Sequence, residues 1–115
     1  MTEGTLYQKY IKPLLLKKGY YFYRIEHFKI PDIYCCRNNR VTWIELKVIN
    51  KKKKEILEPA WRPGQLSWVR EHNLFGNNDS REKILLCLWY MNNYYFLHPK
   101  KVYTLGELKT SIQFN

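Results

Sequence analysis

Residues 29–48 are the part of the sequence that most limits how the chain can fold. They hold two runs of apolar, β-branched and aromatic residues on either side of the tetrapeptide Arg-Asn-Asn-Arg at 37–40. Asparagine tolerates the positive φ angles that a two-residue hairpin turn requires, so this pattern predicts a β-hairpin with the two asparagines in the turn. Counting outward from that turn places Asp32 directly opposite Glu45, with their Cβ atoms about 4.5–5.5 Å apart.

One face of the expected hairpin carries charged side chains. Because side chains alternate along a strand, Lys47 lies on the same face as Glu45, next to Asp32. The opposite face supplies core residues, which are Thr42, Ile44, Leu46 and Val48. Two carboxylates directly opposite one another repel, and holding a proton or a cation relieves the conflict. Hard ions such as Mg²⁺ take oxygen ligands and usually only one or two protein carboxylates, so this face is a candidate metal site.

The combination of Pro31-Asp32 with Glu45-Leu46-Lys47 on the next expected strand resembles the PD-(D/E)xK nuclease superfamily. The resemblance implies an α/β fold with a restriction-endonuclease-like core, in which a mixed central β-sheet is flanked by α-helices. It also implies that Asp32, Glu45 and the carbonyl of Leu46 hold Mg²⁺ or Mn²⁺. Lys47 would assist the attacking water. The alternative is a surface hairpin on which Glu45 and Lys47 form an exposed ion pair.

Two glutamates compete for a further acidic position that many members of this superfamily use in metal binding. Glu3 lies at the start of the first expected helix, and Glu26 closes the strand before the hairpin. The helix dipole alone also favours a carboxylate in a first turn, and a glutamate at a strand end is often simply solvated. Both positions therefore stay open, and Glu3 is included among the candidate catalytic residues.

A glutamine adds a fourth candidate after the two carboxylates and the lysine. Residues 62–68, Arg-Pro-Gly-Gln-Leu-Ser-Trp, resemble a recurrent feature of the VRR-NUC branch of the same superfamily. In that branch a glutamine opens the helix after the E-x-K strand and points back towards the active site, which implies this role for Gln65. Small stand-alone members, as in viruses and archaea, are often Holliday-junction resolvases or other structure-specific nucleases.

The chain is strongly basic, with 20 lysine and arginine residues, 10 aspartate and glutamate residues and a net charge of +10. This balance favours an anionic partner, above all nucleic acid. A membrane surface is the weaker alternative, because no basic amphipathic helix stands out in the sequence. A run of lysines follows the strand that carries Glu45, and we expect it to contact DNA phosphates. The alternative is a solvated loop. The candidate DNA-binding residues are Lys51, Lys52, Lys53, Lys54 and Arg62.

Periodicity and turn signals outside the hairpin predict further helices and strands. Pro13 lies inside the first helix and is expected to kink or split it. Thr104 and Glu107 form a capping box for the last helix, and Asn92-Asn93 marks a second tight turn. The predicted elements are helices over 5–18, 63–74 and 104–112 and strands over 20–27, 83–91 and 94–98.

At 115 residues and 14.1 kDa the chain is expected to be a single nuclease domain, 1–115. No stretch approaches the roughly 18 apolar residues of a membrane helix, and the N-terminus lacks the features of a signal peptide. We therefore expect a cytoplasmic protein, and the resemblance is compatible with a viral or prokaryotic origin. The odd number of cysteines agrees with a reducing compartment, and Cys35, Cys36 and Cys87 are interpreted as small core residues.

Together these features predict a metal-dependent, structure-specific DNA endonuclease that hydrolyses phosphodiester bonds. Its cofactor would be Mg²⁺ or Mn²⁺, and its substrate branched DNA such as a Holliday junction. The alternative is a non-catalytic nucleic-acid-binding module that uses the basic loop and its many tyrosines for stacking. Asp32 and Glu45 separate the two hypotheses, because a pure binder has no reason to place two carboxylates opposite one another on a basic surface.

A homodimer is also expected. Resolving a four-way junction needs two symmetric cuts, which a two-fold dimer supplies. The chain also holds more aromatic surface near its C-terminal strands than a small core should absorb, and about half of it faces outwards unless another element or subunit covers it. These residues are Trp89, Tyr90, Tyr94, Tyr95 and Phe96. The alternative is that the last helix covers them alone.

Overall fold

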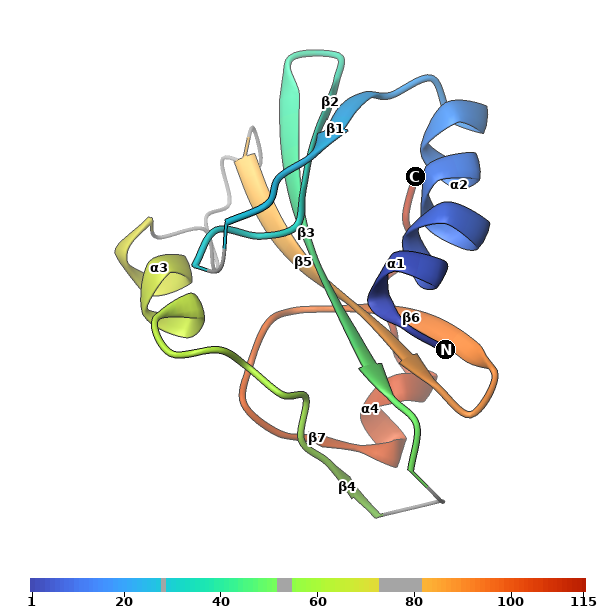
Figure 1. The fold of residues 1–115 in the computed structure, drawn as a ribbon, viewed down its shortest axis with the longest axis vertical. Coiled ribbons are helices and arrows are strands. Elements are labelled where there is room, and N and C mark those ends of the chain that lie inside the picture. The colour runs from blue at the N-terminus through green and yellow to red at the C-terminus, as the bar shows by residue number, and fades with distance from the viewer. Residues whose placement is uncertain (28, 52–54, 73–81) are drawn as a thin grey trace.

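The structure is a computed structural model that describes residues 1–27, 29–51, 55–72 and 82–115 (Figure 1). Its centre is a five-stranded mixed sheet of order β1-β2-β3-β5-β6, and a second sheet pairs β4 with β7, which confirms the expected α/β class. The strands are β1 (Tyr21–Arg24), β2 (Ile33–Arg37), β3 (Arg40–Ile49), β4 (Ile56–Leu57), β5 (Glu82–Tyr90), β6 (Asn93–Leu97) and β7 (Tyr103–Thr104). The helices are α1 (Glu3–Leu6), the π-helical turn η1 (Tyr7–Ile11), α2 (Lys12–Lys17), α3 (Gln65–Glu71) and α4 (Leu105–Lys109).

The central hairpin forms with the predicted register. Both asparagines of its turn have positive φ angles, 54° and 61°, as a two-residue hairpin turn requires. Strand β2 pairs antiparallel with β3, and the pairing ends at Ile33 opposite Ile44. The next position outward on each chain is occupied by Asp32 and Glu45, so the turn chemistry alone determines which two acidic residues meet.

The first helical region extends from Glu3 to Lys17 and contains one wide turn. Pro13 has no N–H, and in a regular α-helix its ring would clash with the carbonyl four residues earlier. The turn η1 lies just before it, where the N–H of Lys12 donates to the carbonyl of Tyr7, five residues back. The chain therefore stays helical through Pro13, and the expected interruption takes the form of a π-helical turn. Among the described residues, no helix is long and apolar enough to cross a membrane.

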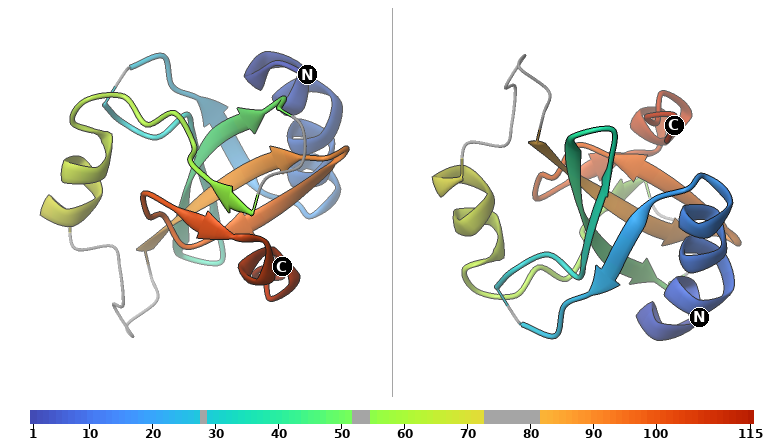
Figure 2. Two further views of the ribbon diagram at one scale, coloured as in Figure 1. Left: turned by 90° about the horizontal axis from the view of Figure 1, so that it is seen from below. Right: turned by 90° about the horizontal axis from the view of Figure 1, so that it is seen from above.

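Both faces of the sheet are covered by other elements. Figure 1 shows α1 and α2 on one side of the sheet and α3 on the other, and both views of Figure 2 agree. On the first side, Leu6, Ile11 and Leu15 of the helices belong to the same buried cluster as Ile44 and Leu46 of β3. A second apolar cluster joins β5 and β6 to β7 and α4. It contains Leu57, Leu86, Leu88, Tyr90, Leu97, Tyr103 and Leu108.

The chain itself covers most of the aromatic residues of β5 and β6. Trp89 packs against Tyr10 of η1, with ring centroids 5.2 Å apart, and Phe96 stacks on Phe114 near the C-terminus at 4.8 Å. Tyr90 is buried in the cluster that involves β7 and α4. The alternative that the last helix covers these residues alone is wrong, because three separate segments share them. The aromatic argument for a dimer therefore loses its premise.

Several boundaries differ from the prediction by one to three residues. Strand β1 covers Tyr21–Arg24, so the predicted strand over 20–27 ends three residues too late. Helix α3 begins at Gln65, two residues later than predicted, because Gly64 has a φ of 89° and a left-handed residue cannot belong to the helix. The rest of the predicted helix beyond residue 72 falls outside the described residues. The second hairpin turn is formed by Met91 and Asn92, with φ angles of 50° and 63°, one residue earlier than predicted.

The C-terminal segment keeps its predicted cap but not its predicted length. The side chains of Thr104 and Glu107 each accept a hydrogen bond from the other residue's N–H, which confirms the capping box. Helix α4 ends at Lys109, because Ile112 leaves the helix and donates its N–H to the carbonyl of Phe96 on β6. The β4–β7 pair was not predicted, since a strand of two residues has no alternation to detect.

Two of the cysteines, Cys35 and Cys36, lie on opposite faces of β2, and Cys87 lies on β5. Cys35 and Cys87 are buried, whereas Cys36 is only half-buried. The prediction of three core cysteines is therefore right for two of them. Burial raises the pKa of the Cys35 thiol to about 12, so this thiol stays protonated at neutral pH and behaves as a small apolar residue.

Candidate active site

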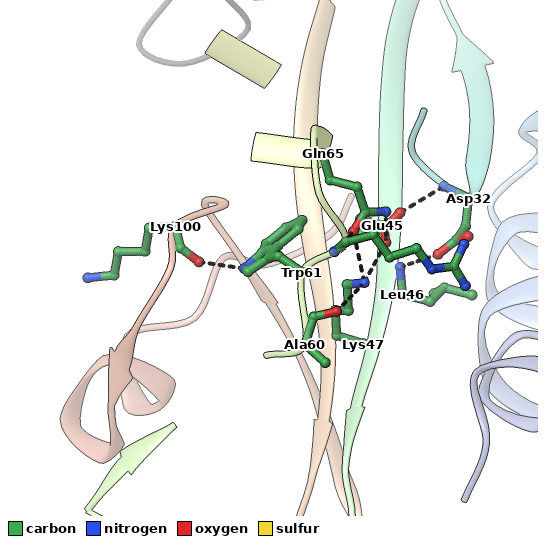
Figure 3. Close-up of polar contacts among 9 residues, drawn as sticks. Asp32, Glu45, Leu46, Lys47, Ala60, Trp61, Gln65 and Lys100 are labelled. Carbon is green, nitrogen blue, oxygen red and sulfur yellow. Dashed lines mark hydrogen bonds and ion pairs between the residues drawn. The ribbon is translucent and has the colours of Figure 1, made fainter. Parts of the chain in front are cut away.

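The hairpin brings Asp32 and Glu45 together at the open end of the β2–β3 pairing (Figure 3). The N–H of Asp32 donates to Oε1 of Glu45 at 3.2 Å, and the N–H of Leu46 donates to Oδ2 of Asp32 at 2.8 Å. Each carboxylate is thus held by a backbone group of the opposite segment. This reciprocal arrangement fixes two negative groups close together in a partly buried position, and it needs no side chain from any other element.

Lys47 lies beside this pair and is almost completely buried. Its Nζ is 3.1 Å from Oε2 of Glu45, and the two side chains are only 4% and 2% exposed, so the alternative of an exposed surface pair is wrong. The Nζ also donates to Oε1 of Gln65 at 3.0 Å and to the carbonyl of Ala60 at 2.9 Å. An ammonium group has three N–H donors, and these three acceptors match them. Lys47 is therefore held as a fully paired cation.

Gln65 connects the lysine, the glutamate and the start of α3. Its Nε2 donates to Oε2 of Glu45 at 2.7 Å, while its Oε1 accepts from Lys47 and from the N–H of Arg62 at 2.7 Å. The residue is 4% exposed. Because Gly64 turns the chain just before the helix, the first residue of α3 faces the sheet, and its amide bridges the two charged side chains.

Burial and the neighbouring Asp32 together perturb the carboxylate of Glu45. The pKa of Glu45 is raised to about 7, first by burial and then by the charge of Asp32, and Lys47 opposes this rise. A further positive charge, in addition to that of Lys47, would therefore stabilise the two carboxylates beside one another. A proton or a metal cation between the two carboxylates would provide it.

Glu3 shares the electrostatic environment of this site, although it comes from the N-terminal helix. Burial raises its pKa and the Asp32 carboxylate adds to the rise, while Lys47 and Arg62 lower it. Glu26 lies exposed beyond the end of β1. Of the two glutamates left open by the sequence, Glu3 is therefore the one that the fold brings within electrostatic reach of the carboxylate pair.

The donor set at this site suits a hard divalent cation. Asp32 and Glu45 offer carboxylate oxygens, and the backbone of Leu46 adds a carbonyl between Glu45 and Lys47 in sequence. Among the described residues, no three His, Cys, Asp or Glu side chains lie close enough to hold a metal ion. A Mg²⁺ or Mn²⁺ ion here would complete its shell with water or phosphate oxygens, which is how Mg²⁺ is usually held in proteins.

The predicted DNA-contacting residues are only partly described. Lys51 is exposed just after β3, and Arg62 is exposed directly before α3. The charge of Arg62 lowers the pKa of Glu3, so its guanidinium lies within electrostatic reach of the site. Lys52, Lys53 and Lys54 fall outside the described residues.

Sequence reasoning missed two residues that enclose Lys47. Ala60 contributes only its carbonyl, and no pattern in the sequence could have identified it. Trp61 places its ring 5.4 Å from Nζ of Lys47, and its Nε1 donates to the carbonyl of Lys100 at 2.9 Å. Figure 3 shows this indole beside the lysine. A tryptophan in an irregular, proline-flanked segment was the available signal, since such a side chain must pack against something.

Comparison with known proteins identifies the fold. No known family profile matches the sequence, and no curated protein does. Among solved structures, the chain is similar to Hjc, a Holliday junction resolvase from the archaeal hyperthermophile Archaeoglobus fulgidus, solved at 1.6 Å resolution. The TM-score is 0.62 and the identity 15%, over 97% of this chain and 92% of that chain. The match covers nearly the whole of both chains, so this protein has the fold of that resolvase.

Proposed function

We propose that this protein is a Mg²⁺- or Mn²⁺-dependent structure-specific DNA endonuclease of the PD-(D/E)xK superfamily, close to its VRR-NUC and Holliday-junction-resolvase members. The observation that carries the proposal is the buried cluster of Glu45, Lys47 and Gln65 beside Asp32. It lies on the sheet of a resolvase-type fold in a chain of net charge +10. Charge, fold and cluster are independent observations that agree on one class of reaction.

Each residue of the cluster has a distinct proposed role. Asp32, Glu45 and the carbonyl of Leu46 would hold the metal ion. When bound, such an ion polarises a phosphoryl oxygen and lowers the pKa of a coordinated water. Lys47 would exchange one of its three present acceptors for the attacking water or a phosphate oxygen, and so position the water and stabilise negative charge that develops on the phosphate. Gln65 would hold the side chains of Glu45 and Lys47 in position by bridging them.

The energetics favour a catalytic role over a purely binding one. Removing charged groups from water costs several kcal/mol per ion, and a buried ion pair often contributes nothing net to stability. Glu45 and Lys47 are buried together, and a second carboxylate sits beside them. A module that only binds phosphate would place its cations in solvent and would avoid this repulsion, so the non-catalytic alternative leaves the cluster without a reason.

The proposed substrate is DNA with a branch or another interruption of the duplex. The basic charge supplies general affinity for phosphates, and phosphate contacts carry no information on base sequence. Recognition of DNA shape is therefore the expected mode. We further propose a homodimer on the four-way junction, because two symmetric cuts require two sites.

Incubation with labelled DNAs tests the function directly. Purified protein is mixed with four-way, flapped and linear duplexes of equal length, with Mg²⁺, with Mn²⁺ and with a chelator. We expect metal-dependent cleavage of branched DNA and much slower cleavage of linear DNA. Binding of all the DNAs without cleavage in either metal would overturn the nuclease assignment. Light scattering at micromolar concentration tests the dimer, since a mass near 14.1 kDa would contradict it.

A further inference from the structure

A continuous row of aromatic rings crosses the sheet on the side of α3. The row, called the aromatic stripe below, consists of Tyr21, Tyr23, Tyr34, Trp43, Trp68 and His72. Neighbouring rings have centroids between 3.9 and 6.2 Å apart along the whole row. The proposed chemistry of the carboxylate cluster does not use any of these rings.

Strand register places the stripe next to the carboxylate pair. Tyr23 pairs with Tyr34, and Tyr34 pairs with Trp43, so these rings share a face across three strands. Tyr34 is two residues after Asp32, and Trp43 is two residues before Glu45. Two residues of a strand span about 7 Å and return to the same face. The aromatic pair is therefore the cross-strand pair adjacent to the acidic pair.

Helix α3 also places a part of the stripe next to the carboxylate cluster. Trp68 follows Gln65 by three residues, which places both on one side of the helix. The ring of Trp68 lies 5.5 Å from that of Trp43, and His72 stacks on Trp68 at 3.9 Å. The helix that supplies the bridging glutamine thus also supplies the end of the stripe.

The rings are held in place and yet partly open to solvent. Nε1 of Trp43 donates to Glu82 at 2.8 Å, which fixes the indole, and Tyr23 stacks on Tyr34 with an interplanar angle of 27°. At the β1 edge, Tyr21 is 69% and Tyr23 is 50% exposed. Large exposed rings in a fixed arrangement form a ready surface for stacking, because little side-chain entropy remains to be lost on binding.

We infer that the aromatic stripe binds unpaired bases of a DNA strand immediately beside the carboxylate cluster. Every base has a π face, so stacking on such rings tolerates any sequence. The inference rests on the proposed nuclease function for the position of the scissile phosphate. It adds a substrate feature, namely that the nucleotides next to the cut are unpaired, as in a flap, an overhang or an opened junction.

Charge favours nucleic acid over a second copy of this chain as the occupant. A two-fold contact through the stripe would bring the exposed arginines beside it against those of the second copy, whereas a phosphodiester strand is attracted to them. Arg62 and Arg70 are exposed on the segment that leads into α3 and on α3 itself, and Trp68 lies between them in the chain. Rings interleaved with arginines are the composition of single-strand stacking surfaces.

Binding measured without metal tests the inference separately from cleavage. Fluorescence anisotropy compares an oligothymidine with a strand of the same length that carries abasic sites, both in a chelator. The variants are Tyr23→Ala, Tyr23→Phe and the control Ile56→Ala, which removes a 55%-exposed apolar side chain from β4, away from the stripe. Circular dichroism melting checks that each variant is folded.

We expect the wild-type protein to bind oligothymidine at least about tenfold more tightly than the abasic strand. Tyr23→Ala should lose about tenfold on oligothymidine and little on the abasic strand, while Tyr23→Phe and Ile56→Ala keep wild-type affinity. Tryptophan fluorescence of the wild type should be quenched by oligothymidine and not by the abasic strand. Equal affinities for the two strands, or a Tyr23→Ala variant that only turns a dimer into a monomer, would overturn the inference.

The two proposals fail in different ways. Base-dependent binding in a protein that cleaves no DNA would remove the nuclease assignment and support the stripe as a binding site. Metal-dependent cleavage combined with base-independent binding would contradict the role of the stripe in base binding and leave the nuclease assignment intact.

Discussion

Strand β3 is buried on both faces, yet the two faces have opposite chemistry. Towards α1 and α2, Ile44 and Leu46 are fully buried in an apolar cluster. Towards α3, Glu45 and Lys47 are also almost completely buried, but they are surrounded by polar partners. Burial therefore does not distinguish a core from a site in this protein. The distinction comes from what each buried side chain contacts.

The two faces also differ in what they contribute to stability. Apolar burial stabilises a fold by about 25 cal/mol per Å², and the face that contains Ile44 stabilises the protein in this way. Burial of the Glu45–Lys47 pair must first offset the desolvation of two charges, with Asp32 adding repulsion. We interpret the first face as the one that folds the chain and the second as the one kept for function. Changing one face at a time tests this division.

The largest effect is expected from the carboxylates. Asp32→Asn and Glu45→Gln should each reduce cleavage of branched DNA to background, a loss of at least about a thousandfold, because the proposed metal ion loses a ligand. DNA binding should stay intact or tighten, because a negative charge that repels phosphate is removed. Single-turnover cleavage and anisotropy measure the two quantities. Cleavage that persists in both variants would show that these two residues do not form the catalytic site.

Lys47→Ala should lower turnover by about a hundredfold or more, while the affinity for metal changes less. The lysine is expected to act on water and on transition-state charge, whereas the metal ligands remain. Cleavage rates at saturating metal, together with metal titrations, separate the two effects. Unchanged turnover would mean that Lys47 only neutralises the buried Glu45.

On the apolar face, Ile44→Ala should lower the free energy of unfolding by about 2–5 kcal/mol, because it removes a fully buried side chain and leaves a cavity. Turnover per folded molecule should stay close to wild type, since the substituted side chain points away from the site. Urea denaturation and cleavage assays at low temperature measure both. A large loss of turnover in a folded Ile44→Ala protein would break the division between the two faces.

Metal binding should stabilise the wild-type protein without any DNA. At ten times its Kd, Mg²⁺ is expected to add about 1.4 kcal/mol to the free energy of unfolding and so to raise the melting temperature. Asp32→Asn should abolish this rise and melt no lower than wild type in a chelator, because repulsion between the carboxylates disappears. Glu26→Gln is the matched control and should keep the full response, whereas Glu3→Gln should reduce it.

The smallest effect is expected from the lysine run. Replacing Lys51, Lys52, Lys53 and Lys54 with serine should weaken binding of all DNAs about equally, since phosphate contacts carry no sequence information. The dependence of log affinity on log salt should flatten by about 0.9 for each duplex phosphate contact that is lost. An unchanged slope would show that these lysines do not touch DNA.

Local rules in the sequence determined the geometry of the hairpin. Two asparagines select a two-residue turn, and strand alternation then places Asp32 opposite Glu45 and Lys47 on the same face. The capping box of Thr104 follows in the same way from residues three positions apart. Such features are predictable because backbone φ preferences and side-chain periodicity act over a few residues and do not depend on the rest of the fold.

Tertiary packing decided the rest, because it joins residues whose separation in the sequence carries no signal. Only the path of the N-terminal helix puts Glu3 within electrostatic reach of Asp32, while Glu26, nearer in sequence, stays exposed. The burial of Lys47 depends on a carbonyl from Ala60, which any residue type could supply. The alignment of rings from two hairpin strands with those of α3 likewise required the helix to be docked. A sequence pattern records which side chains are present and on which face, whereas their partners depend on how distant elements pack.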